Sequence, residues 1–172
     1  MLFLPPPPLL LLLCLVTLAS SDTTTTSPLD GTWQLDIKRD VGSMEQLLAT
    51  MGVGYFTRRV VSTLDMTDRY TVNRTEFRIV RHTKYSDSDQ RYSVDTPEEV
   101  QDPMLGTVRS LVHVNEDLSR VLMTMIRPGD QAIFTGLRHV SVRGDPRLII
   151  HTMNFTLPSG QHASCVRHFV KQ

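Results

Sequence analysis

The sequence has no excess of charge of either sign. Its 172 residues include 18 basic and 18 acidic side chains, so the formal net charge at pH 7 is zero. No run of basic residues is longer than two, as at Arg58-Arg59. Proteins that bind nucleic acid neutralise phosphates with clustered lysine and arginine. The composition therefore argues against nucleic acid as a partner.

Cysteine is almost absent, with only Cys14 and Cys165 in the chain. Two cysteines, one of them in the predicted signal peptide, support neither a disulfide framework nor a zinc site. Cys14 lies in an apolar leader, described below, which leaves Cys165 alone in the rest of the chain. A single cysteine is either buried and inert or pairs between chains, and the burial preference of free cysteine favours the first interpretation.

The motifs of common enzymes are also missing. No G-x-S-x-G elbow places a serine nucleophile, and the glycines form no loop that would cradle a phosphate. The histidines show no metal-ligand spacing such as H-E-x-x-H; they are His82, His113, His139, His151, His162 and His168. We therefore predict that the protein is not an enzyme, and we assign it no cofactor and no metal.

Long apolar runs are confined to the N-terminus. Residues 1–21 carry no charged side chain, and the apolar run 9–18 is followed by the small residues Ala19, Ser20 and Ser21. This pattern is typical of a secretory signal peptide. The alternative is a membrane anchor, but the run is shorter than the ~20 residues of a spanning helix. We expect a secreted, extracellular protein with no integral membrane span.

The signal peptide is followed by a threonine-rich stretch. Residues 22–28 read DTTTTSP, a low-complexity composition that cannot build a core. The sequence therefore predicts a signal peptide at 1–21, a flexible leader at 22–28 and one domain at 29–172.

A short amphipathic helix is predicted soon after the domain begins. Its apolar residues recur at i, i+3, i+4 and i+7, which places them on one helix face; they are Met44, Leu47, Leu48 and Met51. Ser43 and Gln46 have the spacing of a capping box, so the helix is expected to begin at Ser43.

A second helical pattern follows directly. Phe56 and Val60 lie four residues apart, with Leu64 four residues further on. Gly52 and Gly54 separate the two patterns and allow a sharp reversal.

The remainder of the chain reads as strands separated by turn residues. The apolar–polar alternation or strand-like composition marks these segments: 32–38, 69–72, 76–80, 107–114, 120–126, 132–142, 147–155 and 163–170. A polar stretch at 82–90 is expected to be a long turn. Short connections without helical crossovers indicate an antiparallel meander, and a meander this long removes its edges by closing into a barrel.

The residues around the predicted helices resemble a known family. Residues 31–35 read GTWQL and residues 52–60 read GVGYFTRRV, which are similar to the first strand and second helix of the fatty-acid-binding proteins. The resemblance implies an all-β, ten-stranded antiparallel up-and-down β-barrel capped by a short helix-turn-helix. It also implies that this helical lid, with Met44, Leu47, Leu48, Met51 and Phe56, forms the portal of a ligand cavity.

The same resemblance points to a ligand site on the last strand. The family has an Arg-x-Tyr pair there that binds a ligand carboxylate, and here Arg167 matches the arginine while Phe169 replaces the tyrosine. Strand alternation puts Arg167, Phe169 and Cys165 on one face. A guanidinium inside a barrel needs an anionic or hydrogen-bonding partner. The alternative is that this face points outward and Arg167 is solvated.

A second cavity arginine of the family has no certain counterpart. Counting back from the last turn without gaps places Ser141 at its position, with His139 on the same face, while Arg138 falls on the opposite parity. We predict a ligand site of Arg167, Phe169, His139 and Ser141. The loss of the tyrosine hydroxyl leaves a neutral lipid, retinoid or sterol open as ligand.

Two acceptor sequons for N-glycosylation begin at Asn73 and Asn154. Together with the signal peptide they favour a secreted glycoprotein. The function expected from the sequence is extracellular carriage of a small hydrophobic ligand, a fatty acid foremost. The alternative is a secreted barrel scaffold that acts through protein contacts without carrying lipid.

Overall fold

A computed structural model describes residues 26–141 and 145–172. The predicted signal peptide, 1–21, and residues 22–25 of the predicted leader lie outside the described residues. The helical elements are the 3₁₀-helix η1 (Ile37–Arg39), α1 (Met44–Thr50) and α2 (Tyr55–Thr63). The strands are β1 (Gly31–Leu35), β2 (Val41–Gly42), β3 (Met66–Val72), β4 (Glu76–Thr83), β5 (Asp87–Ser93), β6 (Glu98–Asp102), β7 (Gly106–Val114), β8 (Arg120–Ile126), β9 (Ile133–Val140), β10 (Leu148–Thr156) and β11 (His162–Lys171).

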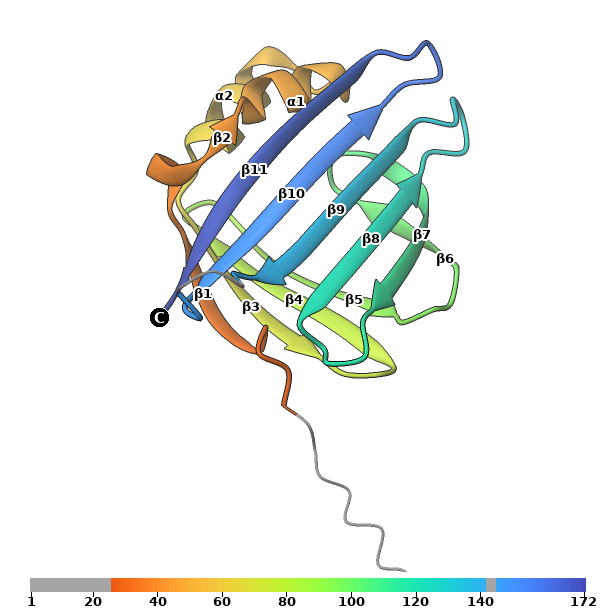
Figure 1. Ribbon diagram of the computed structural model, residues 1–172. Helices are drawn as coiled ribbons and strands as arrows, with labels where there is room; N and C mark the ends of the chain where they lie inside the picture. The colour runs from red at the N-terminus through yellow and green to blue at the C-terminus, as the bar shows by residue number, and fades with distance from the viewer. Residues whose placement is uncertain (1–25, 142–144) are drawn as a thin grey trace, which may run out of the picture.

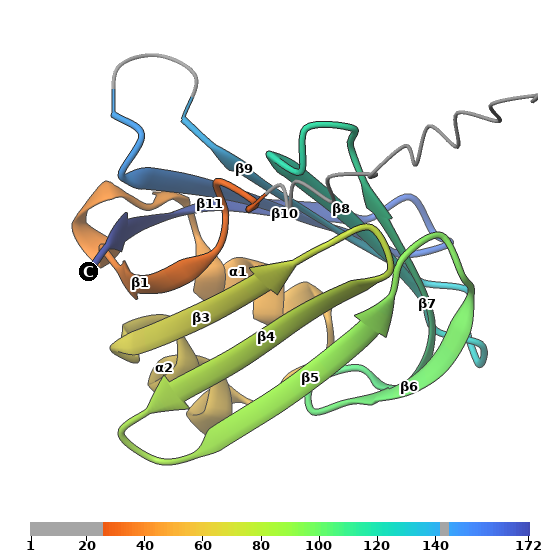
Figure 2. The ribbon, with the colours of Figure 1, turned by 90° about the horizontal axis from the view of Figure 1, so that it is seen from below.

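Ten strands form a nearly closed antiparallel barrel (Figures 1 and 2). The sheet runs β5-β4-β3-β1-β11-β10-β9-β8-β7-β6, and the two-residue β2 pairs with β11 beside it. The strands at the two ends of this path, β5 and β6, are not paired with each other. An isolated bridge joins Val94, which follows β5, to Val112 in β7. The predicted up-and-down barrel with ten strands and a helical cap is confirmed.

The first strand ends earlier than the alternation predicted. β1 stops at Leu35, and the chain then turns through η1, where the Asp36 carboxylate accepts a hydrogen bond from the backbone N–H of Lys38. Ile37 is 39% exposed, so the alternation of 32–38 does not continue a half-buried strand. The local side-chain hydrogen bond of Asp36 competes with the sheet here.

The β4–β5 hairpin also differs from the prediction. The polar stretch 82–90 is not a long turn, because β4 extends to Thr83 and β5 begins at Asp87. Cross-strand pairing holds these polar residues in the sheet, as in the ion pair between Arg78 and Asp89. β5 is polar on both faces because its outward residues meet solvent, while its inward residues Ser88 and Gln90 line the barrel cavity.

The helical cap forms as its sequence predicts. Ser43 is the N-cap of α1, and its hydroxyl accepts a hydrogen bond of 3.1 Å from the backbone N–H of Gln46. Gly52 has a φ of +87° and reverses the chain, whereas Gly54 is the N-cap of α2 with an ordinary φ of −62°. Only Gly52 therefore requires the left-handed conformation that glycine adopts without strain.

Among the described residues, no helix is both long and apolar enough to cross a membrane.

Candidate functional site

The barrel encloses a cavity of about 270 Å³ beneath the helical cap. The predicted apolar face of α1 lines it through Met44, Leu47, Leu48 and Met51. Phe56 is not in the lining and is 84% exposed on α2, so the structure places it on the outer surface of the cap. The cap therefore presents α1 to the cavity and the first turn of α2 to solvent.

A row of three basic side chains crosses the cavity wall. Arg138 on β9 is in register with His151 on β10, which is in register with Arg167 on β11. Residues paired in this way project from the same face of the sheet. All three are buried and line the cavity. Arg167 thus points into the barrel, and its role in ligand binding stays a prediction.

Arg138 is the charged group with the fewest protein partners in this row. It is 5% exposed, and within the described residues its Nε and Nη1 atoms have no hydrogen-bond partner. Its guanidinium carbon lies 5.7 Å from the ring centre of Tyr70 and 5.6 Å from that of Phe77. Cation–π contacts offset part of the cost of burying the charge, but they leave the N–H donors unused.

Arg167 differs because a carboxylate of the protein already faces it. Its Nε donates a hydrogen bond of 3.0 Å to Oδ2 of Asp40, and the Arg167 side chain is 2% exposed. Nη2 of Arg167 and Oδ1 of Asp40 have no partner in the described chain. The pair ties the segment between η1 and β2 to the last strand, and it leaves Arg167 with donors to spare.

His151 stands between the two arginines as a neutral imidazole. Burial, together with the charges of Arg138, Arg81 and Arg167, holds its pKa well below the ordinary value. Its Nε2 has no partner among the described residues, and its ring centre lies 6.4 Å from that of Phe169. His151 therefore supplies a polar atom near the position where Phe169 lacks a hydroxyl.

An ionic cluster on β3 and β4 adjoins Arg138 through Tyr70. Asp68 is fully buried and accepts two hydrogen bonds from Arg81, at 2.7 and 2.8 Å, and one from the Tyr70 hydroxyl at 2.9 Å. Burial alone would raise the pKa of Asp68, but Arg81, Arg138 and Tyr70 together lower it. Because its oxygens are already engaged, Asp68 does not balance the free donors of Arg138.

The structure places His139 and Ser141 outside the cavity, against the prediction. His139 is in register with Ile150, on the face opposite to His151, and neither His139 nor Ser141 is among the lining residues. Counting without gaps set the parity of β9 wrong by one residue, which moves every side chain to the other face. Arg138 takes the inward place.

The other predicted sites are distributed over the surface and core. Asn73 is exposed in the β3–β4 turn, where its side-chain oxygen accepts three hydrogen bonds from Thr75 and Glu76. Asn154 lies within β10, paired on both sides, and its side-chain nitrogen donates to the hydroxyl of Thr135. Cys165 is buried, as its preference predicted.

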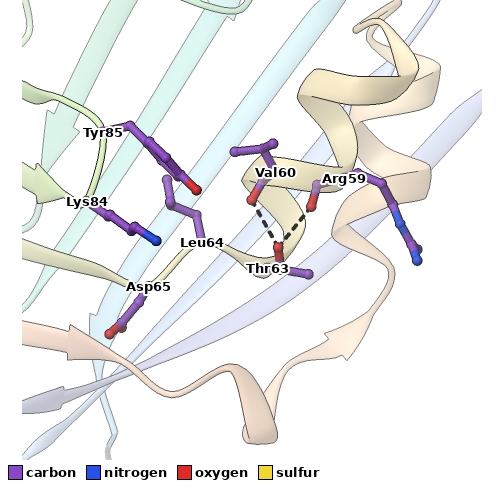
Figure 3. A pocket seen from close by; sticks show the side chains of 7 residues that line it. All are labelled: Arg59, Val60, Thr63, Leu64, Asp65, Lys84 and Tyr85. Carbon is purple, nitrogen blue, oxygen red and sulfur yellow. Dashed lines mark hydrogen bonds between the residues drawn. The ribbon is translucent and has the colours of Figure 1, made fainter.

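A second hollow lies on the surface where α2 meets the β4–β5 turn (Figure 3). Its wall is formed by Arg59, Val60, Thr63, Leu64, Asp65, Lys84 and Tyr85. Its drawn hydrogen bonds run from the Thr63 hydroxyl to the carbonyls of Arg59 and Val60 in the same helix. Among the described residues, none that lines this hollow has a buried polar side-chain atom without a hydrogen-bond partner, in contrast to the barrel cavity.

No protein-family model matches the sequence, and a search of curated proteins finds no match. Solved structures do resemble the chain. A fatty-acid-binding protein from Echinococcus granulosus aligns with a TM-score of 0.67 and 14% identity over 84% of this chain and 97% of that one. A Schistosoma mansoni fatty-acid-binding protein in complex with arachidonic acid aligns with a TM-score of 0.66 and 15% identity over 86% and 98% of the two chains.

The fold is that of the fatty-acid-binding proteins. A third structure, lipid binding protein 8 from Caenorhabditis elegans, has a TM-score of 0.64 and 16% identity, with coverage of 84% of this chain and 96% of that one. All three neighbours are described as fatty-acid-binding or lipid-binding proteins. Similarity at such low sequence identity shows the barrel fold alone. The ligand of this chain has to be inferred from its own cavity.

Proposed function

We propose that this protein binds a fatty acid, or a lipid with a similar single carboxylate, inside the barrel and carries it outside the cell. The main support for this proposal is the buried guanidinium of Arg138. Its Nε and Nη1 atoms have no hydrogen-bond partner among the described residues, and the cavity that Arg138 lines is otherwise largely apolar. A carboxylate at this position would accept those hydrogen bonds and balance the charge. The tail would be held by apolar burial, at about 0.8 kcal/mol per methylene.

The head-group site extends from Arg138 toward Arg167, through His151. In the described part of the chain no carboxylate is hydrogen-bonded to Nε or Nη1 of Arg138, whereas Arg167 is paired with Asp40. The unbalanced charge at this row is therefore that of one arginine, which favours a monoanionic head group over a neutral lipid. His151 offers a neutral ring nitrogen beside the second carboxylate oxygen.

A titration with a fluorescent fatty acid tests the proposed activity. Saturable binding that a natural fatty acid displaces, and that the corresponding methyl ester displaces less well, is the expected result. Absence of binding would leave the alternative of a barrel scaffold acting through protein contacts. The exposed side chains of Phe56 and Tyr85, at 84% and 67%, favour that alternative as an attachment surface.

Extracellular carriage rests on the N-terminal sequence and on the sequons. Expression in a secreting eukaryotic cell is expected to release a protein that begins near residue 22 and carries sugar at Asn73. Asn154 is expected to stay unmodified because both of its strand neighbours pair with it. Retention of an unglycosylated chain beginning at Met1 would overturn this part of the proposal.

A further inference from the structure

The methionines of this protein are concentrated at one place. Apart from Met1, the sequence contains seven methionines, and all seven line the barrel cavity. They come from α1 and its C-cap, β3, the β6–β7 turn, β8 and β10: Met44, Met51, Met66, Met104, Met123, Met125 and Met153.

The rest of the core does not use methionine. In the described part of the chain, the buried hydrophobic residues that do not line the cavity are tryptophan, leucine, valine, isoleucine, phenylalanine, tyrosine, alanine and cysteine. Methionine used as a general gap-filler would be spread through the core. Because methionine is restricted to the lining, its thioethers would contact a ligand in the cavity.

Most of these thioethers are shielded from bulk solvent. Met51, Met66, Met123, Met125 and Met153 are 6% exposed or less, whereas Met44 and Met104 are half-buried. Met123 and Met153 are both in register with Gly136, where a Cβ atom would lie 3.2 Å from Nε2 of His151. Glycine at that position keeps space open between two thioethers and the basic row.

We propose that the cavity methionines reduce hydroperoxides of the bound lipid to alcohols. This inference rests on the proposed function, because the oxidant is the ligand itself: a fatty acid with a hydroperoxide on its tail. The thioether sulfur attacks the terminal oxygen of the hydroperoxide and the O–O bond breaks. The alkoxide takes the hydrogen of the transferred hydroxyl, which leaves a hydroxy fatty acid and methionine sulfoxide. The sulfur is oxidised by two electrons and the peroxide is reduced by two.

Placement inside the cavity supplies what this slow reaction lacks in solution. A carboxylate at Arg138 fixes one end of the ligand, so its tail is held among the sulfurs at a high effective concentration. The reaction is stoichiometric, and methionine sulfoxide is reversible by sulfoxide reductases. Each oxidation also makes the lining more polar, so oxidised protein is expected to bind fatty acid more weakly.

Cys165, the single cysteine outside the predicted signal peptide, is poorly suited to the same chemistry. Cys165 is 1% exposed, and burial and the charge of Asp40 raise the pKa of its thiol. Peroxides react with thiolates rather than thiols, and this thiol does not line the cavity. The cavity sulfurs available to a bound peroxide are therefore thioethers.

The test uses the full chain and the hydroperoxide of linoleic acid. Chromatography with mass spectrometry measures the hydroxy acid formed and the oxygen atoms added to each methionine. We expect one hydroxy acid per sulfoxide, formed at least about tenfold faster than with tert-butyl hydroperoxide at equal concentration, because only the lipid is held in the cavity. Excess saturated fatty acid of the same length should suppress the reaction.

Variants separate oxygen transfer from binding. Replacing Met51, Met66, Met123, Met125 and Met153 by leucine nearly conserves volume and should abolish most hydroxy-acid formation. Leu122→Ile, on the exposed face of β8 and outside the cavity lining, removes no sulfur and should leave the yield unchanged. Displacement of a fluorescent fatty acid, measured on the same samples, reports whether the cavity is intact.

Two results would overturn the inference while leaving lipid binding in place. One is displacement of the fluorescent ligand by the hydroperoxide without any hydroxy acid; flexible packing of methionine would then explain the lining. The other is equal oxidation by the small and the lipid peroxide, unaffected by competitor. The competition experiment needs only wild-type protein, so it tests the inference even if the variant with five methionines replaced does not fold. Failure of the hydroperoxide and of the saturated acid to bind would instead refute the proposed function.

Discussion

Arg138 and Arg167 face the same cavity but differ in what balances their charge. Arg167 donates to Asp40, while the Nε and Nη1 atoms of Arg138 have no partner in the described chain. An unpaired buried charge is costly, so Arg138 is the group that gains most from an anionic ligand. Arg167 serves as a second donor whose availability depends on Asp40.

Asp40 is therefore expected to compete with the ligand for Arg167. Asp40→Asn removes the internal carboxylate, which should tighten fatty-acid binding severalfold and lower the unfolding free energy by about 1.5–3 kcal/mol, the worth of a charged hydrogen bond. Chemical denaturation and ligand titration measure the two effects. Asp89→Asn is the matched control, because its pair with Arg78 is exposed and solvent screening leaves it little effect on stability. Weaker acid binding in Asp40→Asn would contradict competition.

His151 is expected to make the fold sensitive to mild acid. Its pKa in the folded state lies well below the ordinary 6.5, so below pH 6.5 the unfolded chain binds a proton that the folded chain does not. Stability is complete above pH 6.5 and falls as the pH decreases, by up to ~1.4 kcal/mol per unit, until the folded-state pKa is reached.

The check is denaturation between pH 7 and pH 5, compared with His151→Gln. The variant should show a flatter pH dependence than the wild type over this range, since it has no imidazole to protonate. His162→Gln, at an exposed position, should keep the wild-type slope. If His151→Gln retains the full slope, the imidazole does not carry the effect.

The inward arginine and histidine could not be assigned from the sequence for a physical reason. In β9 the outward face carries Ile133 and Leu137, whereas the inward face carries Gly136 and Arg138. Phe134 also lies on the inward face and His139 on the outward face, so β9 lacks the polar–apolar contrast that normally sets strand parity. Arg167 was assigned inward because its place on the last strand resembles that of the ligand-binding arginine of the fatty-acid-binding proteins.

At the scale of elements, the helical cap followed from local chemistry. The spacing of Ser43, Met44 and Met51 predicted both the start of α1 and its buried face, and the structure agrees. The predicted end of the first strand and the predicted long turn at 82–90 were wrong. Pairing across the sheet and the hydrogen bond of Asp36 decide them, and neither is visible in a single segment.

The two glycines of the cap are expected to respond differently to substitution. Gly52→Ala forces a φ of +87° on a residue with a Cβ atom and should lower the unfolding free energy by about 1–2 kcal/mol. Gly54→Ala, at an ordinary φ and with nothing within 4 Å of the new Cβ, should change it by less than about 0.5 kcal/mol. Equal losses in thermal or chemical denaturation would show that the reversal does not depend on Gly52.

At the scale of the whole molecule, the barrel, the helical cap and the basic row of Arg138, His151 and Arg167 together form one candidate binding site. The ten strands remove most free edges and enclose the cavity, and the basic row crosses its wall on three neighbouring strands, visible side by side in Figure 1. The turn signals and strand alternation allowed the barrel to be predicted. The balance of buried charges needed the register of β9, β10 and β11.

The most direct test of this account compares a fatty acid with its methyl ester in the wild type and in Arg138→Leu. Loss of a charge-assisted hydrogen bond costs ~1.5–3 kcal/mol, which corresponds to about ten- to over a hundredfold in affinity. The variant should lose that factor for the acid and bind the ester as the wild type does, while Arg109→Leu, on the exposed face of β7, changes neither. Equal loss for acid and ester, or no loss for either, would contradict an anionic anchor at Arg138.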